Sequence, residues 1–317
     1  MTVEMQEGKP SDAQAAEIAE PLPFPFNQRT FCRYEPIEKR IEEARVLVVD
    51  NLLRDEGDLS EVARKDWGQE VLTHLKRERQ IASLAMQNIV SNVGRLVKQP
   101  HSRIVHITAL DDAIQDFKPD AIVLSGTLRD FDYYKPEILD EFTSFVHATR
   151  TPVLGICGGH QLIGLSFGAR VITLDSQEQQ ERRDNRLTEY QYRFVRIIDP
   201  EDPIFEAIDN PQSGIWQDYT KEARILRVWQ NHSLQLDRVP EDFKLLATSY
   251  LCKNQMMVKR SDDQLIYSVQ FHLEKSFEDW SQSRTRWEHP NESRDGRILF
   301  ENFLRLALEH RIQNRER

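Results

Sequence analysis

The sequence predicts an α/β fold, with a doubly wound, mostly parallel sheet that carries helices on both faces. Short continuous apolar runs at 45–49, 121–124 and 151–155 are typical of strands buried on both faces of a parallel sheet. Segments of helical composition or spacing separate these runs, as a parallel sheet requires. The third run leads directly into a glycine-rich turn around Cys157. We therefore expect this cysteine to lie at a sharp bend, or elbow, between a strand and the following helix.

The first 43 residues differ in pattern from the rest of the chain. Between 21 and 26 every second residue is a proline, which removes backbone N–H groups and argues against a helix interior or a central strand. We therefore expect residues 1–43 to form an N-terminal extension that is partly flexible. A second interpretation is that its aromatic side chains dock onto the main domain or onto a partner.

The main domain is expected to span 44–317. Its first strand ends in Asp50-Asn51, and the proline-free segment that follows is rich in Glu, Arg, Leu, Ala and Gln. This composition predicts an enlarged helical insert near 54–98, which could form a lid, a docking surface or an outer helix. Leu139, Phe142 and Val146 are spaced i, i+3 and i+7, which indicates another helix.

The second half of the chain is richer in strands. The remaining predicted strands are 104–107, 171–174, 192–197, 227–229, 245–248, 256–259 and 265–271, and the remaining predicted helices are 162–167 and 297–310. No internal repeat is visible, so one domain with an extension and an insert explains the length better than two domains.

Composition argues against several classes of protein. The 317 residues include 42 Lys and Arg against 52 Asp and Glu, a formal net charge of −10, which does not suit a nucleic-acid binder. No apolar run approaches the roughly 20 residues that cross a bilayer, so no membrane association is expected. Three cysteines without a CxxC pair indicate a reduced, cytoplasmic compartment. His101, His106 and His147 lack metal-ligand spacing, so no metal is expected.

The sequence GICGGHQ at 155–161 lies between a predicted strand and a predicted helix. A residue at such a sharp turn needs small neighbours two positions away on either side, and Gly155 and Gly159 provide them around Cys157. The unpaired N–H groups and the dipole of a helix N-terminus favour a thiolate there. The N–H of Gly158 could hold an oxyanion. The pattern therefore predicts a nucleophile elbow, which the other two cysteines lack.

The sequence QFHLE at 270–274 supplies a base for this nucleophile. In an extended strand side chains alternate, so His272 and Glu274 would project from the same face. A carboxylate in that position fixes the imidazole tautomer and stabilises its cation.

Together, GICGGHQ and QFHLE resemble the class I (triad) glutamine amidotransferases, and the likeness extends over about 45–309. The resemblance implies that Cys157 is the nucleophile, His272 the base and Glu274 the group that orients it. It also implies that no cofactor is needed.

The resemblance further implies oxyanion and substrate residues. Leu124-Ser125-Gly126 is similar to the family's oxyanion-loop strand, and His232-Ser233-Leu234 to a glutamine-contacting segment of the anthranilate and aminodeoxychorismate synthase branch. The implied oxyanion residues are Gly126, Thr127 and Gly158, and the implied substrate contacts are Gln161, Ser233 and, as a weaker candidate, Asn231.

The chain departs from the family at two positions. Leu273 replaces the usual proline between the His and the Glu, which leaves an additional N–H and a freer φ. Thr127 follows Gly126 where the family usually has Gly-Pro, and a positive φ would disfavour a threonine there.

The function that the resemblance implies is a glutaminase that hydrolyses the side-chain amide of glutamine through a γ-glutamyl thioester. Its ammonia would pass to a separate synthetase or acceptor subunit. One alternative is a stand-alone hydrolase of γ-glutamyl amines or peptides. Another is a non-catalytic interaction protein on the same fold.

Overall fold

The computed structural model describes residues 38–208, 225–275 and 294–316. Apart from 38–43, the predicted N-terminal extension lies outside the described residues. The strands are β1 Ile41–Asp50, β2 Val97–His106, β3 Ala121–Leu124, β4 Val153–Ile156, β5 Val171–Thr173, β6 Glu189–Ile197, β7 Ile225–His232, β8 Leu234–Leu236, β9 Lys244–Thr248, β10 Met256–Arg260 and β11 Leu265–Val269. The helices are α1 Glu61–Trp67, α2 Val71–Leu96, α3 Leu110–Phe117, α4 Pro136–Ala148, α5 Gly158–Ser166 and α7 Arg294–Glu316.

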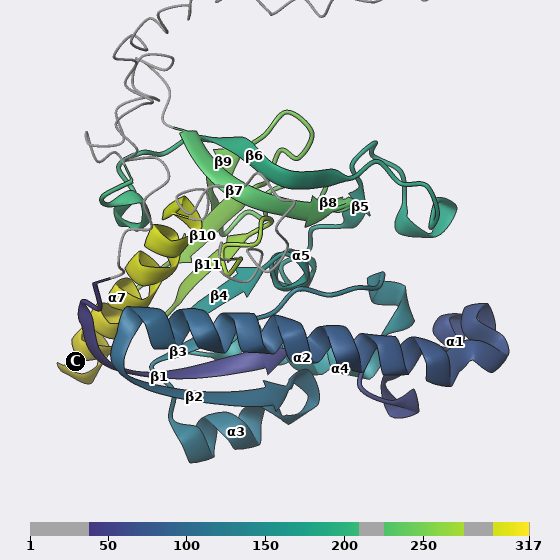
Figure 1. Ribbon diagram of the computed structural model, residues 1–317, viewed down its shortest axis with the longest axis horizontal. Coiled ribbons are helices and arrows are strands. Elements are labelled where there is room, and N and C mark those ends of the chain that lie inside the picture. The colour runs from purple at the N-terminus through teal and green to yellow at the C-terminus, as the bar shows by residue number, and fades with distance from the viewer. Residues whose placement is uncertain (1–37, 209–224, 276–293, 317) are drawn as a thin grey trace, which may run out of the picture.

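The described strands form a nine-stranded sheet in the order β2-β1-β3-β4-β11-β10-β9-β6-β7, and β5 pairs with β8 separately. Neighbouring strands from β2 to β11 are parallel, and those from β11 to β7 are antiparallel. Strands β10, β9, β6 and β7 thus extend the parallel sheet on one side by antiparallel pairing (Figure 1).

Helices cover both faces of the parallel part, which confirms the predicted doubly wound α/β class. One core cluster joins Val48 and Leu154 of the sheet to Ile89 of α2 and Phe303 of α7. The other cluster lies on the opposite face and includes residues of α3, α4 and α5. Strand side chains alternate between the two faces, so the same strands contribute to both clusters.

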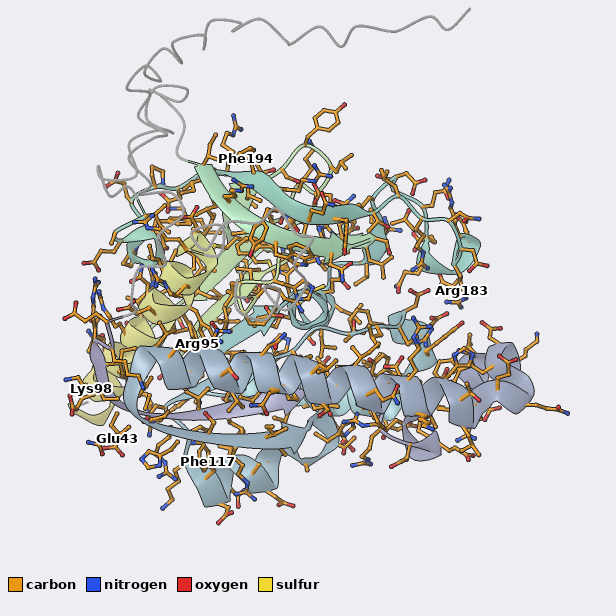
Figure 2. All side chains as sticks on the ribbon, viewed as in Figure 1. Glu43, Arg95, Lys98, Phe117, Arg183 and Phe194 are labelled. Carbon is orange, nitrogen blue, oxygen red and sulfur yellow. The ribbon has the colours of Figure 1, made fainter. Side chains whose placement is uncertain are left out.

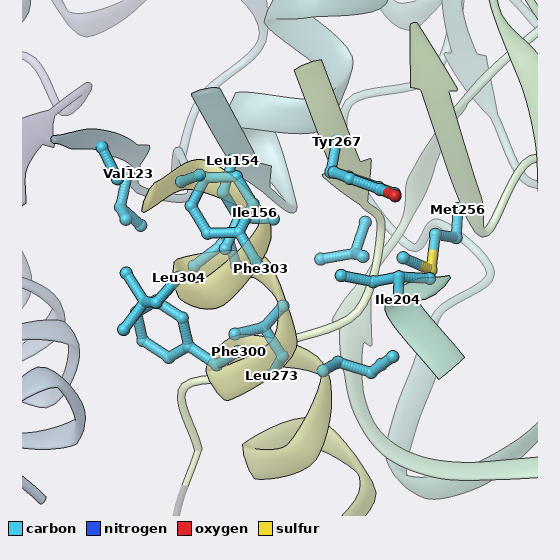
Figure 3. Packing of buried hydrophobic residues seen from close by; sticks show 14 of the residues in the cluster. Val123, Leu154, Ile156, Ile204, Met256, Tyr267, Leu273, Phe300, Phe303 and Leu304 are labelled. Atoms are coloured by element: carbon cyan, nitrogen blue, oxygen red, sulfur yellow. The ribbon is translucent and has the colours of Figure 1, made fainter. Parts of the chain in front are cut away.

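Leu273 belongs to the first of these clusters. It is buried together with Phe300 and Leu304 of α7 and with Ile156 at the end of β4 (Figure 3). The residue that replaces the usual proline of the family therefore fills space between the sheet and α7. Its side chain anchors the turn that carries His272.

The sequence did not predict α3 or β8, and two predicted elements differ clearly from the observed ones. The predicted helical stretch is divided, because Gly68 takes a φ of 49° between α1 and α2. Strand β2 begins at Val97 rather than 104, and most of its residues are exposed because it is the edge strand of the sheet. An exposed edge strand lacks the continuous apolar run that marks buried parallel strands, which is why its first half was not predicted.

The order β3-β4-β11 determines where the candidate residues meet. These three strands are parallel neighbours, with Leu124 opposite Gly155 and Val269 opposite Ile156. Their carboxyl ends therefore lie together, at the edge of an α/β sheet where ligands usually bind.

Candidate active site

Cys157 lies at a strained turn between β4 and α5, with φ 50° and ψ −103°. A non-glycine residue rarely takes this conformation, and where it does a functional constraint is common. A Cβ on Gly155 would lie 2.8 Å from the carbonyl oxygen of Gly159, and a Cβ on Gly159 would lie 2.8 Å from Cβ of Leu124. Only glycine fits at both positions, so the geometry is that of the predicted elbow.

His272 and Glu274 contact each other beside this elbow. The Nδ1 atom of His272 lies 2.7 Å from Oε1 of Glu274. The backbone N–H of His272 donates to the carbonyl oxygen of Trp229 at 2.8 Å, which fixes the histidine against β7. Both residues lie beyond the end of β11: His272 forms an isolated bridge with Trp229, and Glu274 lies in the turn that follows. The contact is present, but the premise of one continuous extended strand was wrong.

Charge controls the protonation of this pair. Burial lowers the pKa of His272, but the negative charge of Glu274 and the charge and hydrogen bond of the Cys157 side chain raise it to about 10. Burial raises the pKa of Glu274, but the charge and hydrogen bond of His272 and the charge of Lys275 together outweigh burial, and the pKa falls below its ordinary value. The site therefore favours an imidazolium between a carboxylate and the sulfur.

Gly126, Thr127 and Gly158 come together next to Cys157. A Cβ on Gly158 would lie 2.3 Å from the backbone nitrogen of Thr127, so the two backbones are in direct contact. A Cβ on Gly126 would lie 3.6 Å from Cβ of Cys157 and 3.5 Å from Cε1 of His272. Among the described residues, the non-glycine positions with positive φ do not include Thr127, so this threonine is not strained.

The three predicted substrate residues have different environments. Gln161 is buried, and its Nε2 donates to the carbonyl oxygen of Leu234 at 3.1 Å. Ser233 is half-buried next to that contact, and its carbonyl oxygen accepts from the N–H of Leu174. Asn231 is exposed on β7, and the described residues show no hydrogen bond from its side chain to the others. Gln161, on α5, thus contacts the segment that contains Ser233, whereas the side chain of Asn231 makes no such contact among the described residues.

Sequence reasoning missed one residue that contacts the candidate nucleophile. The Nε2 atom of Gln270 lies 3.7 Å from Sγ of Cys157. Gln270 immediately follows β11 and precedes His272 by two positions. The sequence signal that could have identified Gln270 is its position at the carboxyl end of a predicted strand, where ligand-binding residues of parallel sheets gather.

Helix α2 contacts the site from two sides. Asn92 donates through Nδ2 to the carbonyl oxygen of Glu274 at 2.6 Å. Nearer the start of the helix, the fully buried Glu78 accepts a hydrogen bond from Nε of Arg129 at 2.6 Å. Arg129 follows Thr127 by two positions, so this bond holds the loop after β3. The helix in the predicted insert therefore braces both the turn after β11 and the loop after β3.

The loop after β3 is held from a second direction. Arg183 lies on the segment after β5 (Figure 2). Its guanidinium pairs with Asp130 at 2.7 Å and with Asp132 at 2.6 Å. Arg186 pairs with Asp130 at 2.6 Å. Four charged side chains thus fix the loop that continues from Thr127.

Two further findings concern the described residues alone. No group of three or more His, Cys, Asp or Glu among them could hold a metal ion. None of the helices they form has the length and apolar character to cross a membrane.

Comparisons with known proteins identify the family. Residues 84–287 match the family model "Glutamine amidotransferase class-I". The glutamine-hydrolysing GMP synthase subunit of Methanothermobacter thermautotrophicus is 26% identical over 209 residues, 66% of this chain and 86% of that protein. The protein of the same name in Pyrococcus furiosus is 32% identical over 175 residues, 55% of this chain and 76% of that protein.

A solved structure has the same fold. The crystal structure of a candidate GMP synthase subunit from Thermoplasma acidophilum aligns with a TM-score of 0.54 and 22% identity, covering 88% of this chain and 100% of that one. This likeness concerns the fold alone, whereas the family model covers both of the sequence motifs that the structure brings together. The chain therefore belongs to the class I glutamine amidotransferase family of enzymes, as the resemblance of its two motifs predicted.

Proposed function

We propose that this glutamine amidotransferase is the glutaminase subunit of a two-subunit GMP synthase, and that it supplies ammonia to a separate synthetase subunit. The observation that carries the proposal is the strained Cys157 elbow beside the His272–Glu274 pair. Support for the acceptor comes from the relatives, which are named as glutamine-hydrolysing subunits of GMP synthases and of which this chain covers 86% and 76%.

In the first half of the reaction, the Cys157 thiolate would attack the side-chain carbonyl carbon of glutamine. An imidazolium beside a thiol favours the thiolate, and the raised pKa of His272 favours the imidazolium. The new C–S bond pushes electrons onto the carbonyl oxygen, where backbone N–H groups of Gly158 and the Gly126–Thr127 segment would stabilise the charge. His272 then gives its proton to the departing nitrogen as the C–N bond breaks, and ammonia leaves.

In the second half, water would hydrolyse the γ-glutamyl thioester. Neutral His272 takes a proton from the water as its oxygen bonds to the thioester carbon. The C–S bond breaks, glutamate leaves and Cys157 returns to the thiolate beside an imidazolium. Glu274 keeps the imidazole in one orientation in both halves. Gln161 and Ser233 would contact the bound glutamine. A reduced, cytoplasmic compartment would keep the sulfur free.

The proposal is tested by following the amide nitrogen. The purified chain is mixed with the synthetase half of a GMP synthase, its nucleotide substrates and glutamine labelled with ¹⁵N at the side-chain amide. We expect ¹⁵N in the GMP formed, and faster glutamate release than from the chain alone. Glutamine hydrolysis without label in GMP would overturn the choice of acceptor. Preferential hydrolysis of a γ-glutamyl amine without any partner would favour the stand-alone hydrolase.

External ammonia provides the control. The Cys157→Ala variant, mixed with the same synthetase, should produce GMP from ammonium chloride and none from glutamine. A variant that still used glutamine would show that Cys157 is not the nucleophile, because no other group in the proposed reaction forms the thioester.

A further inference from the structure

Gln270 is a fully buried amide at the end of β11, next to the candidate nucleophile. Its backbone N–H donates to the carbonyl oxygen of Gln255 at 2.9 Å, which holds the residue against the neighbouring segment. Its side-chain Nε2 lies 3.7 Å from Sγ of Cys157. An N–H group at this distance from sulfur can donate a hydrogen bond, and it can do so more strongly when the sulfur is charged.

The orientation of this amide is fixed by its neighbours. The carbonyl oxygen of Leu234 can only accept, so the group of Gln161 that faces it at 3.1 Å must be the NH₂. The same NH₂ lies 3.1 Å from Oε1 of Gln270. Because that oxygen accepts from Gln161, the other end of the Gln270 amide is its NH₂, and this end faces Cys157.

We propose that Gln270 is a further catalytic residue, which donates a hydrogen bond to the Cys157 thiolate, and that Gln161 is the positioning residue that aims it. The inference rests on the proposed role of Cys157 as nucleophile. In the proposed reaction the sulfur is negative when it attacks glutamine and again when the thioester breaks, and it is neutral in the thioester. A donor to sulfur therefore stabilises the two thiolate states relative to the acylated one.

The acceptor that orients Gln161 is itself held in place. The carbonyl oxygen of Leu234 also lies 2.9 Å from Nδ1 of His232, whose Nε2 lies 3.0 Å from Oε2 of Glu189. These side chains are buried. Both amide hydrogens of Gln161 are thus donated to groups of the protein. Replacement of Gln161 should therefore change the reactivity of the Cys157 sulfur, through Gln270, as well as substrate binding.

Other groups that influence the titration of Cys157 must be kept constant. His272 interacts with the sulfur directly, and Glu274 acts on it through His272. Cys252 interacts with Cys157 electrostatically, and burial raises the pKa of the Cys252 thiol well above its ordinary value. The described loop after β3 places Gly126 and Thr127 there, and neither residue titrates.

The test measures alkylation of Cys157 by iodoacetamide as a function of pH, without glutamine or a partner, with peptide mass spectrometry to assign the adduct. Gln270→Met keeps the length of the side chain and removes the donor. We expect the midpoint of the alkylation profile to move upward, so that alkylation at a fixed pH below the wild-type midpoint slows by roughly tenfold, the effect of one hydrogen bond to a charged group. Gln161→Met should shift the midpoint in the same direction by less.

Two more variants separate the proposal from a packing role. Gln230→Met removes another fully buried amide, whose NH₂ donates to Oε1 of Gln255 rather than to Cys157, and it should leave the alkylation profile unchanged. Gln270→Glu keeps the volume but places a carboxylate beside the sulfur, so it should slow alkylation more than Gln270→Met. Thermal unfolding confirms that each variant is folded.

The outcomes are distinct. A wild-type profile in Gln270→Met and Gln270→Glu would overturn the inference, and so would an equal shift in Gln230→Met. A Gln161→Met variant with a raised KM and an unchanged profile would limit Gln161 to substrate binding and overturn its positioning role. An inert Cys157 in the wild-type chain would instead count against the proposed nucleophile.

Discussion

The protein contains two buried cysteines in the described residues whose surroundings differ sharply. Cys157 is 6% exposed, takes a positive φ at the end of β4, and has His272 and the amide of Gln270 beside its sulfur. Cys252 lies between β9 and β10, is completely buried, and donates from Sγ to the carbonyl oxygen of Asn254 at 3.4 Å. Burial, together with the negative charge of Glu189, raises the pKa of the Cys252 thiol well above its ordinary value.

On the proposed role of Cys157 as nucleophile, the surroundings of a buried sulfur, and not its burial alone, decide whether it can react. Both thiols are largely removed from water, but Cys157 has His272 and the amide of Gln270 beside its sulfur, which would stabilise a thiolate. At Cys252, burial and the charge of Glu189 outweigh the opposing charge of Lys253. Cys252 has an acceptor and a nearby carboxylate, which stabilise the thiol.

The largest expected effect separates the two cysteines directly. Cys157→Ala should abolish glutamine hydrolysis, a loss of at least about 10³-fold in kcat, because no thioester can form. Cys252→Ala should keep kcat within a factor of about two to three, with a stability loss of about 1 kcal/mol. A coupled glutamate assay measures both variants. Equal losses would mean that the two sulfurs do not differ as described.

Removal of the carboxylate tests the cation beside Cys157. Glu274→Gln keeps the shape of the side chain but removes the charge that raises the pKa of His272, so we expect kcat to fall by roughly 10²- to 10⁴-fold. Steady-state kinetics at several pH values measures the change, and circular dichroism checks the fold. A variant with wild-type kcat would contradict the role of Glu274.

Two glycines test the oxyanion backbone next to Cys157. Gly158→Ala places a methyl group 2.3 Å from the backbone nitrogen of Thr127, so the loop must move and kcat should fall by roughly 10²-fold. Gly126→Ala meets only ordinary contacts at 3.5 and 3.6 Å, and it is the matched control with a smaller effect. The comparison of kcat for the two variants gives the result. A larger loss in Gly126→Ala would contradict the close contact of Gly158 with Thr127.

Leu273 tests how firmly the histidine turn is anchored. Leu273→Ala removes a buried side chain between the sheet and α7, and we expect the free energy of unfolding to fall by about 2–5 kcal/mol. Urea unfolding measures this change. An unchanged free energy of unfolding would mean that the position tolerates a cavity and that the turn is held by its backbone alone.

The pH dependence of stability gives the most gradual effect, because it accumulates over several pH units. The folded pKa of His272 is raised from 6.5 to about 10, so its contribution is complete below pH 6.5 and is lost as the pH rises toward 10. The raised pKa of the Cys252 thiol affects stability at higher pH. The unfolded thiol ionises only near about pH 8.5, so the free energy of unfolding falls through this group only above that pH.

Urea unfolding at several pH values separates the two windows. The loss should not exceed about 1.4 kcal/mol per pH unit for each group. Glu274→Gln should flatten the decline that begins at pH 6.5, and Cys252→Ala only the decline above about 8.5. The reverse assignment would contradict the two environments.

Local patterns in the sequence predicted much of the site. The glycines around Cys157 indicate a tight turn because a side chain there would collide with the backbone, and the structure contains those close approaches. The contact between His272 and Glu274 was also expected, but from side-chain alternation along an extended strand, whereas both residues follow the end of β11.

Other features depend on tertiary contacts that no local pattern encodes. Asn92 and the carbonyl oxygen of Glu274 are 182 positions apart in the chain and meet only because α2 packs beside the turn after β11. The contact of Gln270 with Cys157 depends likewise on the pairing of β4 with β11. The exposed first half of the edge strand β2 gave no apolar run to recognise.

The central claim is that Cys157, unlike Cys252, is the nucleophile for glutamine. The most direct measurement is covalent trapping with a chloroketone analogue of glutamine, followed by intact-mass and peptide mass spectrometry. We predict one adduct per chain, on Cys157, that forms more slowly when excess glutamine is present. An adduct on Cys252, or undiminished glutaminase activity in a chain whose Cys157 is fully alkylated, would contradict the claim.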